Sequence, residues 1–459
     1  MLLFFAKVVA MLDLRAKLVL VIAFVLSICL SACGNSSSSD GGSNQNPSSG
    51  SLIWAKQFGV ESYVTEGNAV SADASGNLYV VGTTRGTFAG ESVTNNYSYF
   101  IAKYNSSGTL SWLRQVGYSD GAVYGHGVST DSLGNAYVFG DTSTNISGES
   151  EVNSIISYFI AKYSESGLLL WTHQAGAESS ITNGSGISTD SLGNSYVTGS
   201  TLGSINGESA IGEVDAFVAK YSESGLLLWT TEFGAESSYA SGNGVNVDSS
   251  GNVYVAGHTS GNISGESLVV ENTNYFIAKF SESGASMWTR QVGPESGVDT
   301  ETVGNAVSTD LSGNAYIVGY TDAAISGESR IGYTDYFIAK YSSDGSLLWT
   351  LESGAESGTV PASSVTVDLF GNIYVAGLTD VQLSGESQVG IVDYFIAKYN
   401  QNGLQQWLTQ VGSQGGDTEA NGVTADAAGK VYIGGTTDVG ISGESEVGDT
   451  DYFIAKYYP

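Results

Sequence analysis

Cysteine is almost absent from this chain of 459 residues, which carries only Cys29 and Cys33. Both lie near the N-terminus, so the rest of the sequence has no pair of thiols from which a disulfide could form. A disulfide framework and a cysteine-ligated zinc site are therefore excluded for the body of the protein. Its stability must come from packed apolar side chains, and a segment of about 400 residues is long enough for an ample core.

Positive charge and histidine are also scarce. Lys and Arg together number 16 against 46 Asp and Glu, which gives a formal net charge of −30, and there are three histidines. A surface this negative repels nucleic acid, so we expect no nucleic-acid partner. Such a charge keeps an exported protein dispersed. The sequence also lacks a phosphate-binding loop, a nucleotide fingerprint and a His/Cys metal motif.

Tryptophan, in contrast, marks a repeat. The seven Trp residues follow one another at intervals of 58 to 61 residues, at Trp54, Trp112, Trp171, Trp229, Trp288, Trp349 and Trp407. Each repeat has four short runs rich in Tyr, Val, Ile, Phe and Trp, which are typical of strands. In the first complete copy these runs are 69–73, 77–82, 99–104 and 110–116. No helical periodicity is visible beyond the N-terminus.

Two tight turns, at 73–77 and 105–108 in the first copy, alternate with two longer connections in every repeat. Four short antiparallel strands at a fixed period of this length predict one blade of a β-propeller. The chain ends in a third strand, 452–457, and the repeats begin with a fourth strand, 52–54. The sequence therefore predicts an all-β fold, a single seven-bladed β-propeller in which the N-terminal strand completes the last blade and closes the ring.

Three short motifs recur in order through residues 51–459. They are Asp-x-x-Gly-Asn-x-Tyr-Val-x-Gly, Tyr-Phe-Ile-Ala-Lys-Tyr and Gly-x-Leu-x-Trp, and the last copy departs from the first motif with Lys430 in place of Asn. This pattern resembles the SBBP type of bacterial β-propeller repeat. The resemblance implies the propeller fold but little about activity, because these repeats occur in surface and exported proteins of diverse role.

The first 50 residues predict export. The apolar stretch 18–30 follows Arg15 and Lys17, is short for a membrane-spanning helix and has the build of a secretory signal. It ends in Leu-Ser-Ala-Cys-Gly, which looks like a bacterial lipobox, so we expect cleavage before Cys33 and lipidation of its thiol. An ordinary signal peptide or an uncleaved anchor is the alternative, and Met11 is an alternative start.

The predicted domains are a lipoprotein signal peptide at 1–32, a lipidated Cys with a flexible Ser/Gly/Asn-rich tether at 33–50, and the propeller at 51–459. Gly34, directly after the lipidated residue, favours sorting to the outer membrane in a host that has two membranes. We expect the lipid to be the only contact with the membrane, and the protein to be a monomer.

Acidic residues are unevenly distributed between the two faces of the predicted ring. The connections from second to third strand and from fourth strand to the next repeat share one face, here called the loop face. The two tight turns share the opposite one, the turn face. The loop face carries roughly three times as many Asp and Glu residues as the turn face. A surface of one sign attracts cations or basic partners.

The most regular acidic element of the loop face is the motif Ile-Ser-Gly-Glu-Ser. Its glutamates are Glu91, Glu149, Glu208, Glu266, Glu328, Glu386 and Glu444, and in four repeats a second acid precedes the third strand, at Asp215, Asp335, Asp393 and Asp451. These oxygens are candidate calcium ligands. No copy has the dense Asp-x-Asp-x-Asp-Gly pattern of a calcium loop, so we favour the alternative that the motif bonds backbone amides and fixes the loop shape. The sequence indicates no cofactor other than calcium.

Two further charged residues recur once per repeat, an Asp that opens the first tight turn and a Lys in the third strand. We expect both to be structural, the Asp as a cap of the hairpin turn and the Lys as the partner of a neighbouring acid. The tryptophans are expected to pack between blades or at the rim.

Positions at which the repeats differ are better candidates for a ligand site. The residue that opens the innermost strand predicts a polar ring around the channel mouth, formed by Asn68, His126, Ser185, Asn243, Asn305, Ser363 and Asn421. The residue that ends the second strand differs in almost every repeat, being Thr83, Asp141, Ser200, His258, Tyr320, Leu378 and Thr436. This diversity indicates a partner-binding position, or else a tolerant exposed site. No spacing of His with Ser, Cys or Asp indicates a catalytic pair.

These observations favour a non-catalytic, lipid-anchored module of the cell envelope that binds a protein or glycan through its acidic loop face. One alternative is a structural or assembly module stabilised by calcium. A further alternative is an enzyme, such as a lyase or hydrolase acting on a polysaccharide at the channel mouth, in which His126 or Asp141 would be needed for turnover.

Overall fold

The computed structural model describes residues 48–88, 90–91, 96–146, 154–263, 265, 272–295 and 300–459. The predicted signal peptide, Cys33 and most of the tether lie outside these residues, as do Glu149 and Glu266. In the described part of the chain every regular element is a strand, and no helix there is long and apolar enough to cross a membrane.

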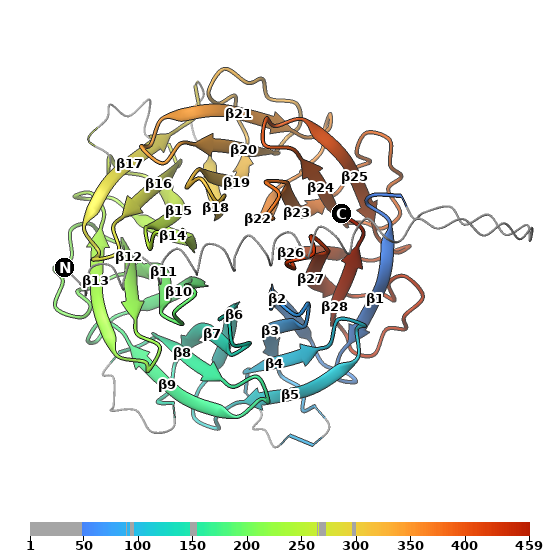
Figure 1. Ribbon diagram of the computed structural model, residues 1–459, viewed down its shortest axis with the longest axis horizontal. Coiled ribbons are helices and arrows are strands. Elements are labelled where there is room, and N and C mark those ends of the chain that lie inside the picture. Colours follow the sequence, from blue (N-terminus) through green and yellow to red (C-terminus); the bar gives the residue numbers. More distant parts are fainter. Residues whose placement is uncertain are drawn as a thin grey trace, which may run out of the picture. The chain divides into compact units, whose positions relative to one another are not determined.

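Seven four-stranded antiparallel sheets form the ring, each with its first strand at the centre and its fourth at the rim (Figure 1). Blade 1 consists of β2 (Thr65–Ala72), β3 (Leu78–Thr84), β4 (Ser98–Tyr104) and β5 (Leu110–Val116). Blade 2 consists of β6 (Val123–Thr130), β7 (Ala136–Thr142), β8 (Ser157–Tyr163) and β9 (Leu169–Ala175). Blade 3 consists of β10 (Thr182–Thr189), β11 (Ser195–Thr201), β12 (Asp215–Tyr221) and β13 (Leu227–Phe233).

The second half of the ring repeats this order. Blade 4 consists of β14 (Ala240–Val247), β15 (Val253–Thr259), β16 (Asn274–Phe280) and β17 (Ser286–Val292). Blade 5 consists of β18 (Thr302–Thr309), β19 (Ala315–Thr321), β20 (Asp335–Tyr341) and β21 (Leu347–Ser353). Blade 6 consists of β22 (Ala362–Val367), β23 (Ile373–Thr379), β24 (Asp393–Tyr399) and β25 (Gln405–Val411).

Blade 7 joins the two ends of the propeller. It contains β26 (Thr418–Ala425), β27 (Val431–Thr437) and β28 (Asp451–Tyr457), and its outer strand is β1 (Leu52–Phe58). β1 pairs antiparallel with β28, with Trp54 opposite Lys456. The predicted seven-bladed propeller, closed by its N-terminal strand, is confirmed.

The inner strands are longer than the sequence predicts. The expected first strand of blade 1 was 69–73, whereas β2 begins at Thr65 and pairs with β3 across a bulge between Gly67 and Ala69. Glu66 and Gly67 have low strand propensity, and they are held extended by pairing with β3 and by a bond from the Gly67 amide to Thr436 Oγ1 of blade 7 at 3.3 Å. The bulge recurs at the equivalent place in all seven blades.

Burial follows position in the blade. Every residue of β3 and β4 is buried, because these strands have neighbours on both edges and blades on both faces, whereas β5 is half exposed at the rim. The Tyr-Phe-Ile-Ala-Lys-Tyr run is thus a fully buried strand. Its first and last tyrosines join neighbouring blades: the Tyr158 hydroxyl of blade 2 lies 2.7 Å from the Tyr221 hydroxyl of blade 3.

Candidate functional site

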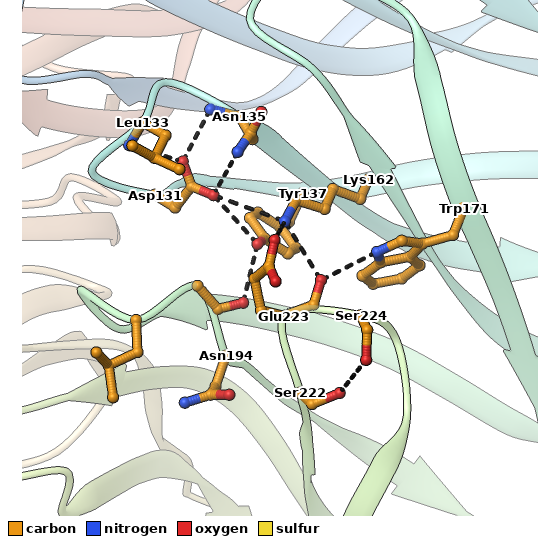
Figure 2. Close-up of polar contacts among 12 residues, drawn as sticks. Asp131, Leu133, Asn135, Tyr137, Lys162, Trp171, Asn194, Ser222, Glu223 and Ser224 are labelled. Carbon is orange, nitrogen blue, oxygen red and sulfur yellow. Dashed lines mark hydrogen bonds and ion pairs between the residues drawn. The ribbon is translucent and has the colours of Figure 1, made fainter.

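The turn face is occupied by one arrangement that recurs around the ring, shown for blades 2 and 3 in Figure 2. Asp131 Oδ1 accepts the backbone amides of Leu133 and Asn135 at 3.0 and 2.9 Å, which is the expected cap of the hairpin turn. Its Oδ2 accepts the Asn135 side-chain amide at 2.7 Å and the Tyr137 hydroxyl at 3.2 Å. Burial and this aspartate raise the pKa of Tyr137 far above its usual value.

The lysine of the third strand links this cap to the next blade. Lys162 is buried, with its Nζ 4.9 Å from the centre of the Tyr137 ring and 3.8 Å from Asp131 Oδ2. The same Nζ donates to Glu223 Oε1 of blade 3 at 2.7 Å, and Trp171 Nε1 donates to the Glu223 backbone oxygen at 3.2 Å (Figure 2). The repeated Asp, Lys and Trp of the turn face therefore join blades to one another.

The loop-face glutamates follow a tight turn. In blade 3 the Glu208 amide donates to the Ile205 oxygen at 2.9 Å, with Asn206 and Gly207 between them at φ of 53° and 90°. Two consecutive residues of positive φ make a type I′ turn, which explains the recurring Ser-Gly or Asn-Gly. The Glu444 carboxylate of blade 7 pairs with Lys56 at 2.8 Å.

The second acids of the loop face turn inward instead. Asp335 is fully buried, and its two oxygens accept the amides of Ile331 and Gly332 at 2.6 and 2.8 Å. Asp215, Asp393 and Asp451 make the equivalent pairs of bonds. The motif Ile/Val-Gly-x-x-Asp is thus a capped turn. Across the described residues, no three His, Cys, Asp or Glu side chains are gathered in a way that could hold a metal ion.

The inner strands surround a central channel. All seven residues of the predicted polar ring line one cavity of about 320 Å³, which is bounded by the first strands of the seven blades. Each ring residue occupies the bulge of its strand, as His126 does between Gly125 and Gly127. In blades 1, 4, 5 and 7 the ring residue is Asn, which donates to a backbone oxygen of the following blade, as Asn68 does to Gly125 at 2.8 Å.

The variable residue of the second strand lies beside the ring residue of the same blade. His126 Nε2 is 3.0 Å from Asp141 Oδ2, Asn243 Nδ2 is 3.0 Å from His258 Nδ1, and Asn421 donates to Thr436 at 3.2 Å. Burial lowers the pKa of His258. The two residue sets that were predicted separately therefore meet at the channel mouth in these blades. No such bond joins Ser185 to Ser200, Asn305 to Tyr320 or Ser363 to Leu378, all of which are described.

Blades 1 and 2 carry an additional stack of side chains, here called the blade 1–2 ladder, which consists of Arg85, Tyr97, Tyr124, His126 and Asp141. The Arg85 guanidinium lies 4.1 Å from the centre of the Tyr97 ring, and the rings of Tyr97 and Tyr124 are 5.1 Å apart. The rings of Tyr124 and His126 are 6.3 Å apart and nearly parallel. Asp141 ends the ladder and also accepts the Gly184 amide of blade 3 at 2.5 Å.

A different environment exists where blade 7 meets blade 1. Burial raises the pKa of Glu419, and the neighbouring carboxylates of Asp417, Asp438 and Glu66 raise it further. The Asp438 carboxylate accepts the Asp417 amide at 2.6 Å. The junction of blades 7 and 1 is therefore acidic, whereas the ladder of blades 1 and 2 is mostly aromatic.

The repeats match a known family along the whole ring. Residues 53–88, 111–146, 170–206, 228–264, 288–325, 348–383 and 406–441, together more than half of the chain, match the SBBP family, described as a β-propeller repeat. The chain belongs to the SBBP family. A comparison with curated proteins finds no match.

Solved structures share the fold of this SBBP propeller at low sequence identity. A chain in the crystal structure of the mitotic checkpoint complex is 10% identical, with 94% of this chain and 98% of that chain covered and a TM-score of 0.50. U3-55K is 9% identical over 87% and 98%, with a TM-score of 0.47. The polysaccharide lyase Uly1 is 12% identical over 85% and 90%, with a TM-score of 0.46. At these identities the likeness shows the fold alone.

Sequence reasoning missed three residues of the ladder in the SBBP propeller. Where blade 2 has Tyr124, the other blades have Glu66, Asn183, Ser241, Val303, Pro361 and Glu419. Arg85 and Tyr97 likewise stand at positions that carry no other Arg or aromatic residue in the aligned repeats. Departure from the repeat was the available signal. The β-propeller fold supports a binding role, and the ladder is a group of neighbouring side chains that departs from the repeat.

Proposed function

We propose that this SBBP propeller is a non-catalytic, lipid-anchored module of the cell envelope that binds a protein or glycan through its loop face, at the blade 1–2 ladder. The observation that carries the proposal is the ladder itself, a contiguous departure from the repeat beside the polar channel. The sevenfold residues of the turn face are used in contacts between blades, which leaves the varied positions of the loop face for recognition.

The chemistry of the ladder suits a polar partner. An exposed guanidinium, two phenols and an imidazole present hydrogen-bond donors and aromatic edges side by side. Tyr and Arg are enriched where interfaces gain most of their binding energy. The surrounding acidic residues of the loop face steer basic groups of a partner and repel anionic ones.

The test uses residues that the other blades already carry. The double variant Tyr124→Ser, His126→Asn gives blade 2 the side chains found at Ser241 and Asn243 in blade 4, so we expect it to fold with an unchanged melting temperature. Its binding to purified envelope polysaccharides and envelope proteins, measured by biolayer interferometry, should weaken at least tenfold for the partner that wild type binds. The control is Glu165→Gln on the turn face. Equal loss in both variants, or in neither, would exclude the ladder as the binding site.

A second candidate function rests on the pair of His126 and Asp141. A carboxylate 3.0 Å from an imidazole orients the ring and supports its action as a general base, here beside a polar cavity. This geometry favours the alternative of a polysaccharide lyase or hydrolase. Turnover of a polysaccharide panel that is abolished in His126→Asn, with binding retained, would support the enzyme over the binding module.

A further inference from the structure

One position in the outer strands, buried in every blade except blade 4, carries two different residues around the ring. It is glutamine in five blades, at Gln57, Gln115, Gln174, Gln291 and Gln410, and glutamate in blades 3 and 5, at Glu232 and Glu352. The side chain in either form lies inside the blade: Gln410 is 6% exposed, Glu232 6% and Glu352 5%. A carboxyl group buried where an amide serves elsewhere costs free energy unless it is neutral or paired.

In blade 6 the side-chain amide of the glutamine forms hydrogen bonds with all the polar groups around it. Gln410 Oε1 accepts the Leu383 amide at 2.8 Å, and its Nε2 donates to the Val381 oxygen at 3.1 Å and to Asp393 Oδ2 at 2.8 Å. Gln57 does the same in blade 7, towards Ile441, Val439 and Asp451. The amide group thus holds the loop between second and third strands and neutralises no charge.

In blades 3 and 5 a carboxyl oxygen stands in place of that amide nitrogen. Glu232 Oε2 accepts the Ile205 amide at 3.3 Å, while its Oε1 is buried without a hydrogen-bond partner, and both oxygens of Glu352 are buried without one. Each glutamate faces a buried aspartate, Asp215 or Asp335, with which it can form a hydrogen bond only when one of the two carboxyl groups is protonated. Two adjacent buried carboxylates repel each other and cannot both stay charged.

The backbone decides which carboxyl group keeps its charge. Asp215 already accepts the amides of Ile211 and Gly212 at 2.7 and 2.9 Å, and Asp335 accepts those of Ile331 and Gly332. Amide donors favour the charged form of an acid, so the proton of the pair goes to the glutamate, which lacks such a pair of amides. We propose that Glu232 and Glu352 each hold a proton against Asp215 and Asp335, which makes blades 3 and 5 a pH-sensitive device inside the ring.

The charged groups that face the two glutamates all have the same sign. Besides Asp215 on β12, Glu208 of the loop faces Glu232, and besides Asp335 on β20, Glu328 faces Glu352. Within the described residues neither glutamate has an ion pair. Burial, followed by these carboxylates, raises the pKa of Glu232 to about 7 and that of Glu352 to about 7, from an ordinary 4.5.

Because the pKa of each glutamate is higher in the folded chain, the stability of the fold depends on pH. Between pH 4.5 and about 7 the folded chain holds protons that the unfolded chain has released. The stabilisation is therefore complete below pH 4.5 and is lost as the pH rises through 7. Deprotonation puts a second negative charge beside Asp215 and Asp335, next to loops 202–214 and 322–334. These loops lie on the loop face, so their anchoring weakens with rising pH.

The test replaces each glutamate by the residue of the other five blades. The double variant Glu232→Gln, Glu352→Gln should melt at the wild-type temperature at pH 5 and several degrees higher at pH 8, on the order of 2–5 °C. The matched control, Glu236→Gln with Glu356→Gln, removes two exposed charges from the adjoining loops of blades 3 and 5. It should keep the pH dependence of wild type. Parallel profiles for wild type and the Glu232→Gln, Glu352→Gln variant would overturn the proposal.

Two further measurements distinguish a shared proton from a bound cation. Gln410→Glu builds a third such pair against Asp393 and should steepen the loss of melting temperature between pH 5 and pH 8. Hydrogen exchange of loops 202–214 and 322–334, corrected for intrinsic rates, should speed up at pH 8 in wild type but not in the Glu232→Gln, Glu352→Gln variant. If millimolar calcium at pH 5, where the pairs should be protonated, stabilises wild type and not that variant, the pairs hold a cation and the shared proton is refuted.

Discussion

Ala216 of β12 and Phe280 of β16 pack in one core cluster at the junction of blades 3 and 4. At each of the other six junctions of the described ring, two tyrosine hydroxyls occupy the equivalent places and bond to each other. Phe233 lies 5.2 Å from Phe280, ring centre to ring centre, and 5.6 Å from Phe276. At the junction of blades 3 and 4 both hydroxyls are missing, so no buried hydroxyl is left without a partner. The phenyl rings supply the packing there.

The substitution Phe280→Tyr should therefore destabilise the protein, although Tyr stands at this position in the six other blades. The new hydroxyl would be buried opposite Ala216 with no partner, at a cost of about 1–3 kcal/mol. Chemical denaturation at equilibrium measures the change. The reverse substitution, Tyr341→Phe, strands the Tyr275 hydroxyl and serves as the comparison, with a loss of similar size. Unchanged stability in Phe280→Tyr would contradict the account of this junction.

The lysines of the third strand differ in whether they form an ion pair with a buried aspartate. Lys162 and Asp131 are both buried and 3.8 Å apart, whereas no ion pair of Lys398 is found among the described residues, and its Nζ lies 5.5 Å from the centre of the Tyr374 ring. Burial lowers the pKa of Lys398. Lys162→Met should cost about 3–5 kcal/mol, since it takes the cation away from the buried Asp131 carboxylate, which keeps only the hydrogen bonds of the turn cap.

Lys398→Met is the matched control and should cost clearly less. Both variants keep the aliphatic stem that packs on the tyrosine ring, so the difference between their unfolding free energies isolates the charge. Equal losses would show that the stem, and not the ion pair, joins the blades at this face.

The fold could be predicted because the sequence pattern of one blade recurs seven times. A weak strand signal such as 69–73 is therefore supported by the equivalent segments of the other repeats. The period and the closing strand 52–54 required no knowledge of contacts between blades. The extension of β2 to Thr65 could not be predicted, because its polar start is held extended by tertiary contacts, namely pairing with β3 and bonds to blade 7.

The site was less predictable because it depends on register. His126 and Asp141 lie 15 positions apart on neighbouring strands, and His126 occupies a bulge that the sequence pattern does not reveal. The motif Ile/Val-Gly-x-x-Asp around Asp335 is compatible with a capped turn. The inward direction of the Asp335 carboxylate is seen only from its bonds to the amides of Ile331 and Gly332. Whether the loop-face acids bind a cation stays a prediction.

The lipid anchor is tested at Cys33. In a bacterial host that processes lipoproteins, wild type should incorporate labelled palmitate and fractionate with the membrane, and Cys33→Ser should do neither. Cys29→Ser is the control, because that residue would leave with the signal peptide. Incorporation of label into Cys33→Ser, or its absence from wild type, would favour an ordinary signal peptide.

Calcium should not stabilise the propeller beyond the screening of its charge. The Glu444 carboxylate is paired with Lys56 at 2.8 Å, and the four inward aspartates accept backbone amides, so these groups already have partners. Titration calorimetry of residues 34–459, with melts in calcium, in chelator and in sodium chloride of matched ionic strength, measures the effect. Weak heat without a specific thermal shift is the expected result. Saturable binding with a large rise in melting temperature would instead place cations in the acidic loops and make the calcium-stabilised envelope module the leading function.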